Sequence, residues 1–294
     1  MANTSGTPSS STLLRWTALI VVAANVAFIV VYTKVGEPPM IAEAMAEYGY
    51  TFVPANFVKA MCAVLVAAIL CFYVVALWPS RRRRRIYDAL VTPLAGASVL
   101  ASFWIVAAKN LEIGLSMALI AASVALGAAM FARVASESPS RHSLWLRVPF
   151  SLHFGAMTIA LLVALAQWMN AGGRLAANTL APDELTATFL AIAVLAGGYV
   201  ALRYGDFVYP AVIAWGTGAI FVAQRAQDPY VAAAALTVCV GMLAVAGLAA
   251  MKQARTPRSD ARDKPSRRIK VKSEPRKQDS WGYRLDGNSS IMRL

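Results

Sequence analysis

The sequence predicts an all-α, polytopic membrane protein: a transmembrane bundle of about eight helices with both termini in the cytoplasm. Of its 294 residues, 58% are hydrophobic, and the mean hydropathy is +0.55. The apolar residues gather in runs of about twenty, the length that a helix needs to cross the roughly 30 Å hydrocarbon layer. Basic residues gather at alternate ends of these runs, which sets an orientation. Because a soluble domain would not carry so much apolar surface, the lipid bilayer is the first expected partner.

The apolar runs define the expected helices. They span residues 13–33, 57–78, 89–108, 113–131, 148–169, 184–202, 207–222 and 230–251. The first run is longer than a signal-peptide core and lacks a clear small-x-small cleavage site, so we expect a retained helix. A short surface helix is expected over residues 41–48. Residues 13–251 thus form the expected membrane domain, which follows a disordered segment at 1–12.

The distribution of Lys and Arg predicts that both termini face the cytoplasm, with the chain in an inner or plasma membrane. Basic residues near span ends favour the cytoplasmic side. In this orientation thirteen of them lie at cytoplasmic ends and five at the opposite ends. The cytoplasmic ones are Arg15, Arg81 to Arg85, Arg133, Arg141, Arg147, Arg203, Lys252, Arg255 and Arg258, against Lys34, Lys59, Lys109, Arg174 and Arg225. An even number of spans agrees with two cytoplasmic termini.

The C-terminal segment, residues 252–294, is polar and dense in Arg and Lys. This composition predicts a disordered basic tail. One interpretation is a solvated tail that fixes the topology. The other is electrostatic contact with anionic lipid, worth about 1 kcal/mol for each basic residue near the surface. Nucleic acid is not an expected partner, because no aromatic stacking platform accompanies the charge.

The fifth apolar run carries the only histidine within a hydrophobic segment. Pro149 suits the first turn of a helix, so we expect this helix to begin near Val148. One face of the helix would present small residues that favour a close helix contact: Ser151, Gly155 and Thr158. A second face would present a different set: His153, Met157, Ala160, Ala164 and Gln167. The spacing predicts that both faces pack inside the bundle.

His153 has two interpretations: a structural or interfacial histidine, or a group that binds a ligand or handles protons. Intramembrane ionisable residues are costly and therefore often functional. Tryptophans in or near the runs belong either to an interfacial aromatic belt or to the wall of a ligand cavity. The candidate ligand-binding residues are His153, Met157, Gln167, Trp168, Trp104 and Trp215.

Motifs for catalysis and for metal binding are absent from the sequence. The other histidine, His142, lies outside the apolar runs, which excludes a two-histidine haem site. The three cysteines all lie within apolar runs and show no metal-ligand spacing. We find no paired intramembrane carboxylates, no Ser-His-Asp set and no phosphate-binding glycine loop. An enzyme is therefore disfavoured, and the residues identify no cofactor.

Two motifs carry a family resemblance. Residues 147–160 read Arg-Val-Pro-Phe-Ser-Leu-His-Phe-Gly-Ala-Met-Thr-Ile-Ala, and residues 50–57 read Tyr-Thr-Phe-Val-Pro-Ala-Asn-Phe. With Asn25 in the first run, they resemble the fifth-helix signature, the second-helix start and a first-helix asparagine of bacterial tryptophan-rich sensory protein-like membrane proteins. That group is distantly similar to the translocator protein (peripheral benzodiazepine receptor) family. The resemblance covers about residues 13–250.

The resemblance implies a helical bundle that binds, senses or transports a lipophilic small molecule, with a tetrapyrrole (porphyrin) or a sterol-like compound as ligand. This chain has His153 and Ala156 where the signature has tyrosine and tryptophan. Two other classes stay open. One is a structural or assembly factor whose helices and basic tail contact partner proteins, and whether the chain forms an oligomer also stays open. The other is a membrane enzyme with an unrecognised site.

Overall fold

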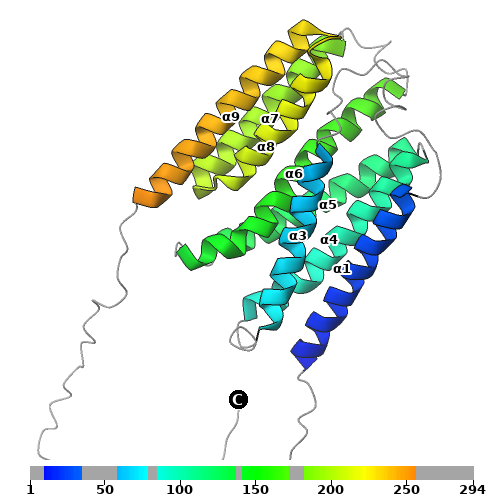
Figure 1. The fold of residues 1–294 in the computed structure, drawn as a ribbon, viewed down its shortest axis with the longest axis vertical. Helices are drawn as coiled ribbons and strands as arrows, with labels where there is room; N and C mark the ends of the chain where they lie inside the picture. Colours follow the sequence, from blue (N-terminus) through cyan, green and yellow to red (C-terminus); the bar gives the residue numbers. More distant parts are fainter. Residues whose placement is uncertain are drawn as a thin grey trace, which may run out of the picture. The chain divides into compact units, whose positions relative to one another are not determined.

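The computed structural model describes residues 10–34, 58–78, 85–110, 112–136, 141–171 and 182–255. These residues form eight α-helices and no strand (Figure 1). The helices are α1 (Ser10–Lys34), α3 (Val58–Leu77), α4 (Arg85–Lys109), α5 (Ile113–Ser136), α6 (Arg141–Ala171), α7 (Pro182–Tyr204), α8 (Val208–Gln224) and α9 (Pro229–Arg255). The predicted all-α helix bundle is confirmed.

Each helix covers one of the predicted apolar runs to within one residue at either end. Seven are long and apolar enough to cross a membrane, and α8, with 17 residues, is shorter. The chain is therefore a multi-pass membrane protein in contact with a lipid bilayer. The expected surface helix at 41–48 and the tail from residue 256 lie outside the described residues.

Helix α6 is shared by two groups of helices. In the first group, each helix contacts its two neighbours in the order α1, α3, α6, α5, α4 and back to α1. These five helices form a closed ring, which we call the helix ring. In the second group, α7, α8 and α9 contact one another, and both α7 and α8 also contact α6. Of the α6 span, 61% is buried, against 17% of the α1 span. Helix α6 is therefore the element around which the others pack (Figure 1).

The start of α6 differs from the prediction. The helix begins at Arg141, so Pro149 lies in its interior instead of its first turn. Proline removes one backbone hydrogen bond from a helix interior. For this reason, Pro149 led us to expect the helix to start beside it. The preceding turns are held by tertiary contacts instead. The Arg147 side chain lies 7% exposed and donates hydrogen bonds to the carbonyls of Ala135 (3.0 Å) and Tyr204 (3.5 Å).

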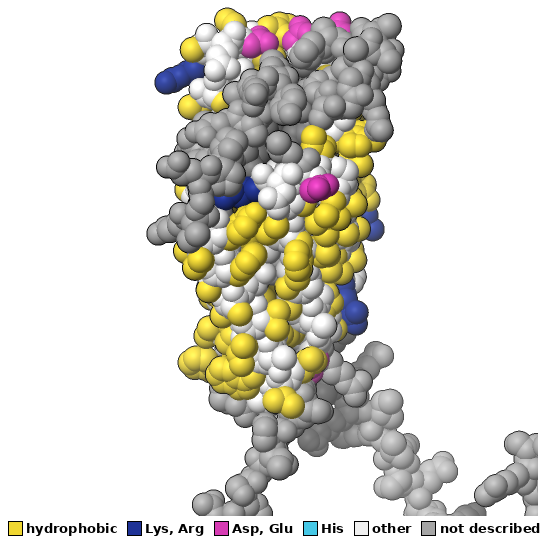
Figure 2. Space-filling view, turned by 90° about the vertical axis from the view of Figure 1, so that its right-hand side faces the viewer, with side chains coloured by type: hydrophobic (Ala, Val, Ile, Leu, Met, Phe, Trp, Pro, Cys, Tyr) yellow, Lys and Arg dark blue, Asp and Glu magenta, His cyan; other side chains and the backbone are white. Residues whose placement is uncertain are grey.

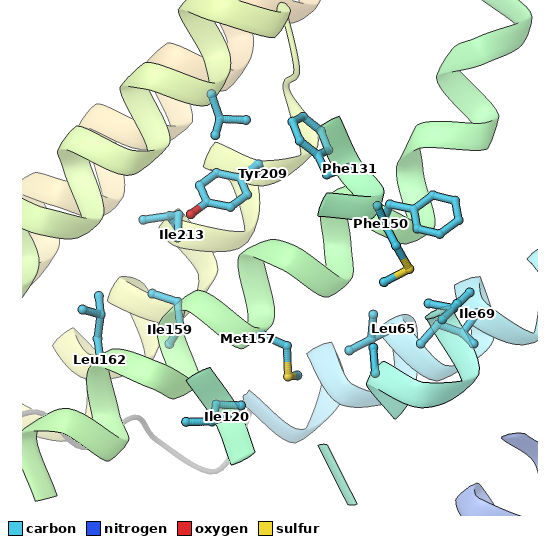
Figure 3. Packing of buried hydrophobic residues seen from close by; sticks show 14 of the residues in the cluster. Leu65, Ile69, Ile120, Phe131, Phe150, Met157, Ile159, Leu162, Tyr209 and Ile213 are labelled. Carbon is cyan, nitrogen blue, oxygen red and sulfur yellow. The ribbon is translucent and has the colours of Figure 1, made fainter. Parts of the chain in front are cut away.

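Hydrophobic side chains fill the interior and cover much of the outer surface. The core cluster contains Ile120, Met157 and Ile159 from two helices of the ring and Ile213 from α8 (Figure 3). Figure 2 shows hydrophobic side chains over a broad band of one face of the molecule. Some large apolar side chains, such as that of Leu195, have most of their surface exposed. Such a surface suits a lipid environment, in which helices satisfy their backbone groups internally.

Candidate functional site

The small-residue face of α6 makes a close helix contact, as predicted, and its partner is α8. The Ser151 hydroxyl donates at 2.6 Å to Oδ1 of Asp206, which lies just before α8. A Cβ placed on Gly155 would lie 3.0 Å from the Val212 Cβ. Farther along, the Tyr209 hydroxyl donates to Thr158 Oγ1 at 3.0 Å. The helix contact expected from these three small residues is therefore confirmed.

The second face of α6 faces α5 inside the helix ring. His153 is 1% exposed and packs against Gly127, where an added Cβ would lie 3.2 Å from the imidazole Cδ2. Its Nε2 lies 3.4 Å from Ser123 Oγ. The interfacial position considered for His153 does not agree with this burial. The histidine is an interior residue of the bundle.

The Ser123 hydroxyl lies between the Ala97 carbonyl and this histidine. Ser123 has a single hydroxyl hydrogen, which it donates to the Ala97 carbonyl at 3.4 Å. With that hydrogen on the Ala97 side, the serine oxygen accepts from His153, and we assign the imidazole hydrogen to Nε2 on this basis. A neutral imidazole with its hydrogen on Nε2 leaves a lone pair on Nδ1. Within the described part of the chain, Nδ1 has no hydrogen-bond partner.

These contacts belong to a polar layer across four helices of the ring. The Asn25 side chain of α1 donates to the Ser98 carbonyl of α4 at 3.1 Å, one residue beyond Ala97. Ser123 and His153 continue the layer into α5 and α6. Ala97 lies near the middle of its span, residues 86–109. Ionisable groups at this depth are costly in a membrane protein, which makes His153 the candidate functional residue of this layer.

Two further polar atoms lie buried without a hydrogen-bond partner among the described residues: Trp104 Nε1 and Ser116 Oγ. Trp104 follows Ala97 by seven residues on α4, and Ser116 precedes Ser123 by seven residues on the antiparallel α5. Both atoms therefore lie about 10 Å from the polar layer along the helix axes, on the same side of it. Buried polar groups in proteins are nearly always hydrogen-bonded, so each unpaired atom is a candidate contact for a bound molecule.

A comparison with protein families identifies the chain. The family model described as TSPO-like protein matches residues 12–248, which include all eight helices almost completely. The chain belongs to the TSPO-like protein family. This result confirms the family resemblance of the sequence motifs. Neither the search of curated proteins nor the search of solved structures gives a match for this TSPO-like protein.

The structure describes the side chains of five of the six predicted site residues of the TSPO-like protein. His153, Met157 and Trp104 lie on helices of the ring, with His153 and Met157 on one face of α6. Trp168 lies near the end of α6 and is half-buried. Trp215 lies on α8, outside the ring, and is 41% exposed. The side chain of Gln167 is outside the described residues. The described residues contain no group of three His, Cys, Asp or Glu that could hold a metal ion.

The sequence interpretation missed Asp206, which lies between α7 and α8. Its carboxylate is 4% exposed and accepts hydrogen bonds from the Ser151 hydroxyl and the Tyr209 backbone N–H (2.8 Å). Burial raises the pKa of the Asp206 carboxyl, while these hydrogen bonds and the charge of Arg147 oppose the increase. Its neighbour Gly205 adopts a φ of 63°, which favours glycine. The one feature of the sequence that could have indicated this buried aspartate is a Gly-Asp pair before an apolar run. Such a pair is equally typical of an exposed turn.

Proposed function

We propose that this TSPO-like protein binds a lipophilic small molecule within the helix ring, between the polar layer and the level of Trp104 and Ser116 on α4, α5 and α6. The observation that carries the proposal is that three buried polar atoms at and near the polar layer lack hydrogen-bond partners among the described residues: Trp104 Nε1, Ser116 Oγ and His153 Nδ1. A ligand with a few polar groups would satisfy atoms that the bundle itself leaves unpaired.

The chemistry of these atoms restricts the ligand. The Trp104 indole can only donate a hydrogen bond, while the assigned tautomer makes His153 Nδ1 an acceptor. The surrounding side chains, including Ile120 and Met157, are apolar. The ligand is therefore mostly apolar and carries separate donor and acceptor groups. Of the ligands that the family resemblance suggests, a tetrapyrrole with pyrrole N–H donors and carboxylate acceptors has this character, whereas a sterol-like compound has one hydroxyl and could satisfy only one of these atoms at a time. Sensing or transport in the inner or plasma membrane would use the same site.

Ligand titration of the purified protein tests this proposal. Protoporphyrin IX and cholesterol are titrated separately into protein in lipid nanodiscs, with His153→Leu and Trp104→Phe as site variants. Loss of one hydrogen bond, about 1.4 kcal/mol, should weaken binding of at least one probe about tenfold. Trp215→Phe, on α8 outside the ring, is the matched control and should bind like the original protein.

The melting temperature of each variant separates a lost site from a damaged fold. His153→Leu should melt no earlier than the original chain, because Ser123 keeps its bond to Ala97 and an unpaired nitrogen is removed. Normal melting with weakened binding supports the site. If His153→Leu and Trp104→Phe bind both probes with unchanged affinity, or if neither probe binds the original protein, the proposal is wrong.

A further inference from the structure

Asp206 is a buried acid whose hydrogen-bond donors are all uncharged. It lies in the turn between α7 and α8 and is 4% exposed. Its carboxylate accepts hydrogen bonds from the Ser151 hydroxyl at 2.6 Å and from the backbone N–H groups of Tyr209 and Val208. Asp206 forms no ion pair with any residue that the structure describes. Because a charge buried without such a partner is costly, this position favours the protonated acid.

The buried cation that acts on Asp206 binds other groups. Arg147 of α6 is 7% exposed and donates to backbone carbonyls in the last turns of α5 and α7. Its charge acts on the Asp206 carboxyl from beyond ion-pair distance. In the helix ring, by contrast, Arg15 Nε lies 2.8 Å from Asp88 Oδ1, and the Asp88 side chain is 32% exposed. Asp206 is therefore more deeply buried than Asp88, and its charge is less directly compensated.

The other charged and titratable side chains around this turn lie at the adjoining helix ends. They are Arg203 and Tyr204 of α7, Tyr209 of α8, and Lys252 and Arg255 of α9. The lysine and the two arginines are exposed, and the Tyr209 hydroxyl donates to Thr158 Oγ1 on α6. Asp206 is the carboxyl of this group, and carboxylic acids are the side chains that ordinarily titrate below about pH 5. We therefore assign a change of charge here in the acidic to neutral range to Asp206.

The Asp206 carboxyl joins α6 to the group formed by α7, α8 and α9. Its donor Ser151 lies on the face of α6 that contacts α8. One turn farther along this contact, a Cβ on Gly155 would lie 3.0 Å from the Val212 Cβ. Separation of α6 from α8 would remove the Ser151 donor and expose the carboxyl to water.

Exposure to water would weaken the binding of a proton. Burial raises the pKa of the Asp206 carboxyl above the ordinary value of 3.8 while the helices are in contact. Hydration favours the charged form of an acid, so it would return the pKa towards that value. The arrangement that holds the proton more tightly is favoured at low pH, and the other arrangement is favoured at high pH.

We propose that Asp206 is a proton-binding site that clamps α7, α8 and α9 onto α6. With the proton bound, the α6–α8 contact is closed. When the carboxyl O–H bond breaks and the proton passes to water, the contact opens. Proton binding and closure are reciprocal, so a contact that is held closed must bind the proton more tightly. A ligand in the helix ring takes no part in this step, so the clamp is independent of the proposed ligand site.

A disulfide that holds α6 against α8 tests this reciprocity. The variant carries Gly155→Cys and Val212→Cys, at positions close enough for a disulfide, whose Cβ atoms lie about 3.5–4.5 Å apart. The natural cysteines are replaced by alanine at Cys62, Cys71 and Cys239. Oxidised and reduced protein in lipid nanodiscs are titrated from pH 4 to pH 9. The infrared carbonyl band of the protonated acid reports the proton, and Asp206→Asn identifies the band by its absence.

The pH at which half of this band is lost should be about one unit higher in the oxidised protein, a tenfold change in proton binding. The chain with Val212→Cys alone is the control, because oxidation cannot link its helices and its midpoint should not move. Equal midpoints in the oxidised and reduced forms of the two-cysteine protein would show that closure and proton binding are independent. Absence of an Asp206 band at every pH would show that the carboxyl stays ionised. Either result overturns the proposal.

Hydrogen exchange tests the opening without a disulfide. Asp206→Asn cannot ionise, so its α6–α8 contact should stay closed at every pH. Residues 208–212 include the two backbone N–H groups that bind Asp206. Above the midpoint, this segment should exchange several times faster in the original chain than in Asp206→Asn at the same pH, and below the midpoint the two chains should match. If the two chains exchange equally above the midpoint, loss of the proton does not open the contact, and the clamp is wrong.

Discussion

Gly155 of α6 lies so close to Val212 of α8 that a Cβ on the glycine would be 3.0 Å from the valine Cβ. Glycine allows two membrane helices to approach in this way. We expect Gly155→Leu to destabilise the protein by about 1–3 kcal/mol, the usual cost of overpacking. Thermal melting of purified protein measures the effect. Gly198→Leu is the control, because nothing lies within 4 Å of a Cβ at that position. Equal melting of the two variants would contradict the tight contact.

Arg15 joins three helices of the ring through its guanidinium. It is 1% exposed, donates to the Ala76 carbonyl and to Asp88, and lies 5.8 Å from the Tyr87 ring centroid. We expect Arg15→Ala to cost about 2–3 kcal/mol, since bonds to charged groups are lost and a buried carbonyl loses its donor. The comparison is Arg133→Ala, which removes an exposed arginine of α5. Its melting temperature should stay close to that of the original protein. A normal melting temperature for Arg15→Ala would show that the ion pair is not structural.

Asp206 should make stability depend on pH. Because burial raises the pKa of its carboxyl above the ordinary value of 3.8, the folded state holds the proton more tightly than the unfolded state. The free energy of unfolding should therefore fall as the pH rises from about 4 to the raised pKa, and should level off above it. Asp206→Asn should flatten this slope. The control Asp183→Asn leaves Asp206 in place, so the slope should be unchanged. Melting curves recorded between pH 4 and pH 8 measure this slope. If the slope is unchanged in Asp206→Asn, the pH dependence of stability belongs to another group.

The basic residues at span ends predict that both termini are cytoplasmic. Single cysteines at Glu43 and Asn178 should then react with a membrane-impermeant maleimide in intact cells, after the natural cysteines are replaced. A cysteine at Ser138 should react only after the cells are opened. Reaction at Ser138 together with protection at Glu43 would reverse the orientation.

The helices could be predicted from the sequence because hydrophobic runs of twenty residues are rare outside membrane-spanning helices. The contact face of Ser151, Gly155 and Thr158 could also be predicted, because three small residues at helical spacing suit a close approach. The partner helix could not be named, since the neighbours of a helix depend on contacts between residues far apart in the chain.

The buried charges were missed for a related reason. Asp206 and Arg15 both lie beside apolar runs, where charged residues usually face water or lipid headgroups. Arg15 was interpreted only as a signal for topology, and its partner Asp88 lies 73 residues away. The pairing of His153 with Ser123 likewise depends on the α5–α6 register, which no local pattern specifies. The ligand site was predicted from residue types alone, and it stays a prediction until a ligand is measured.

The contacts of Arg15 also have a consequence for biogenesis. The residues that bind its guanidinium, Ala76 and Asp88, are 61 and 73 positions later in the chain. When α1 leaves the ribosome, neither partner has been synthesised. A lone arginine at a helix end can only extend its side chain to the membrane surface until partners arrive. We therefore expect α1 to reach its final depth in the bilayer only after α3 and α4 have been inserted beside it.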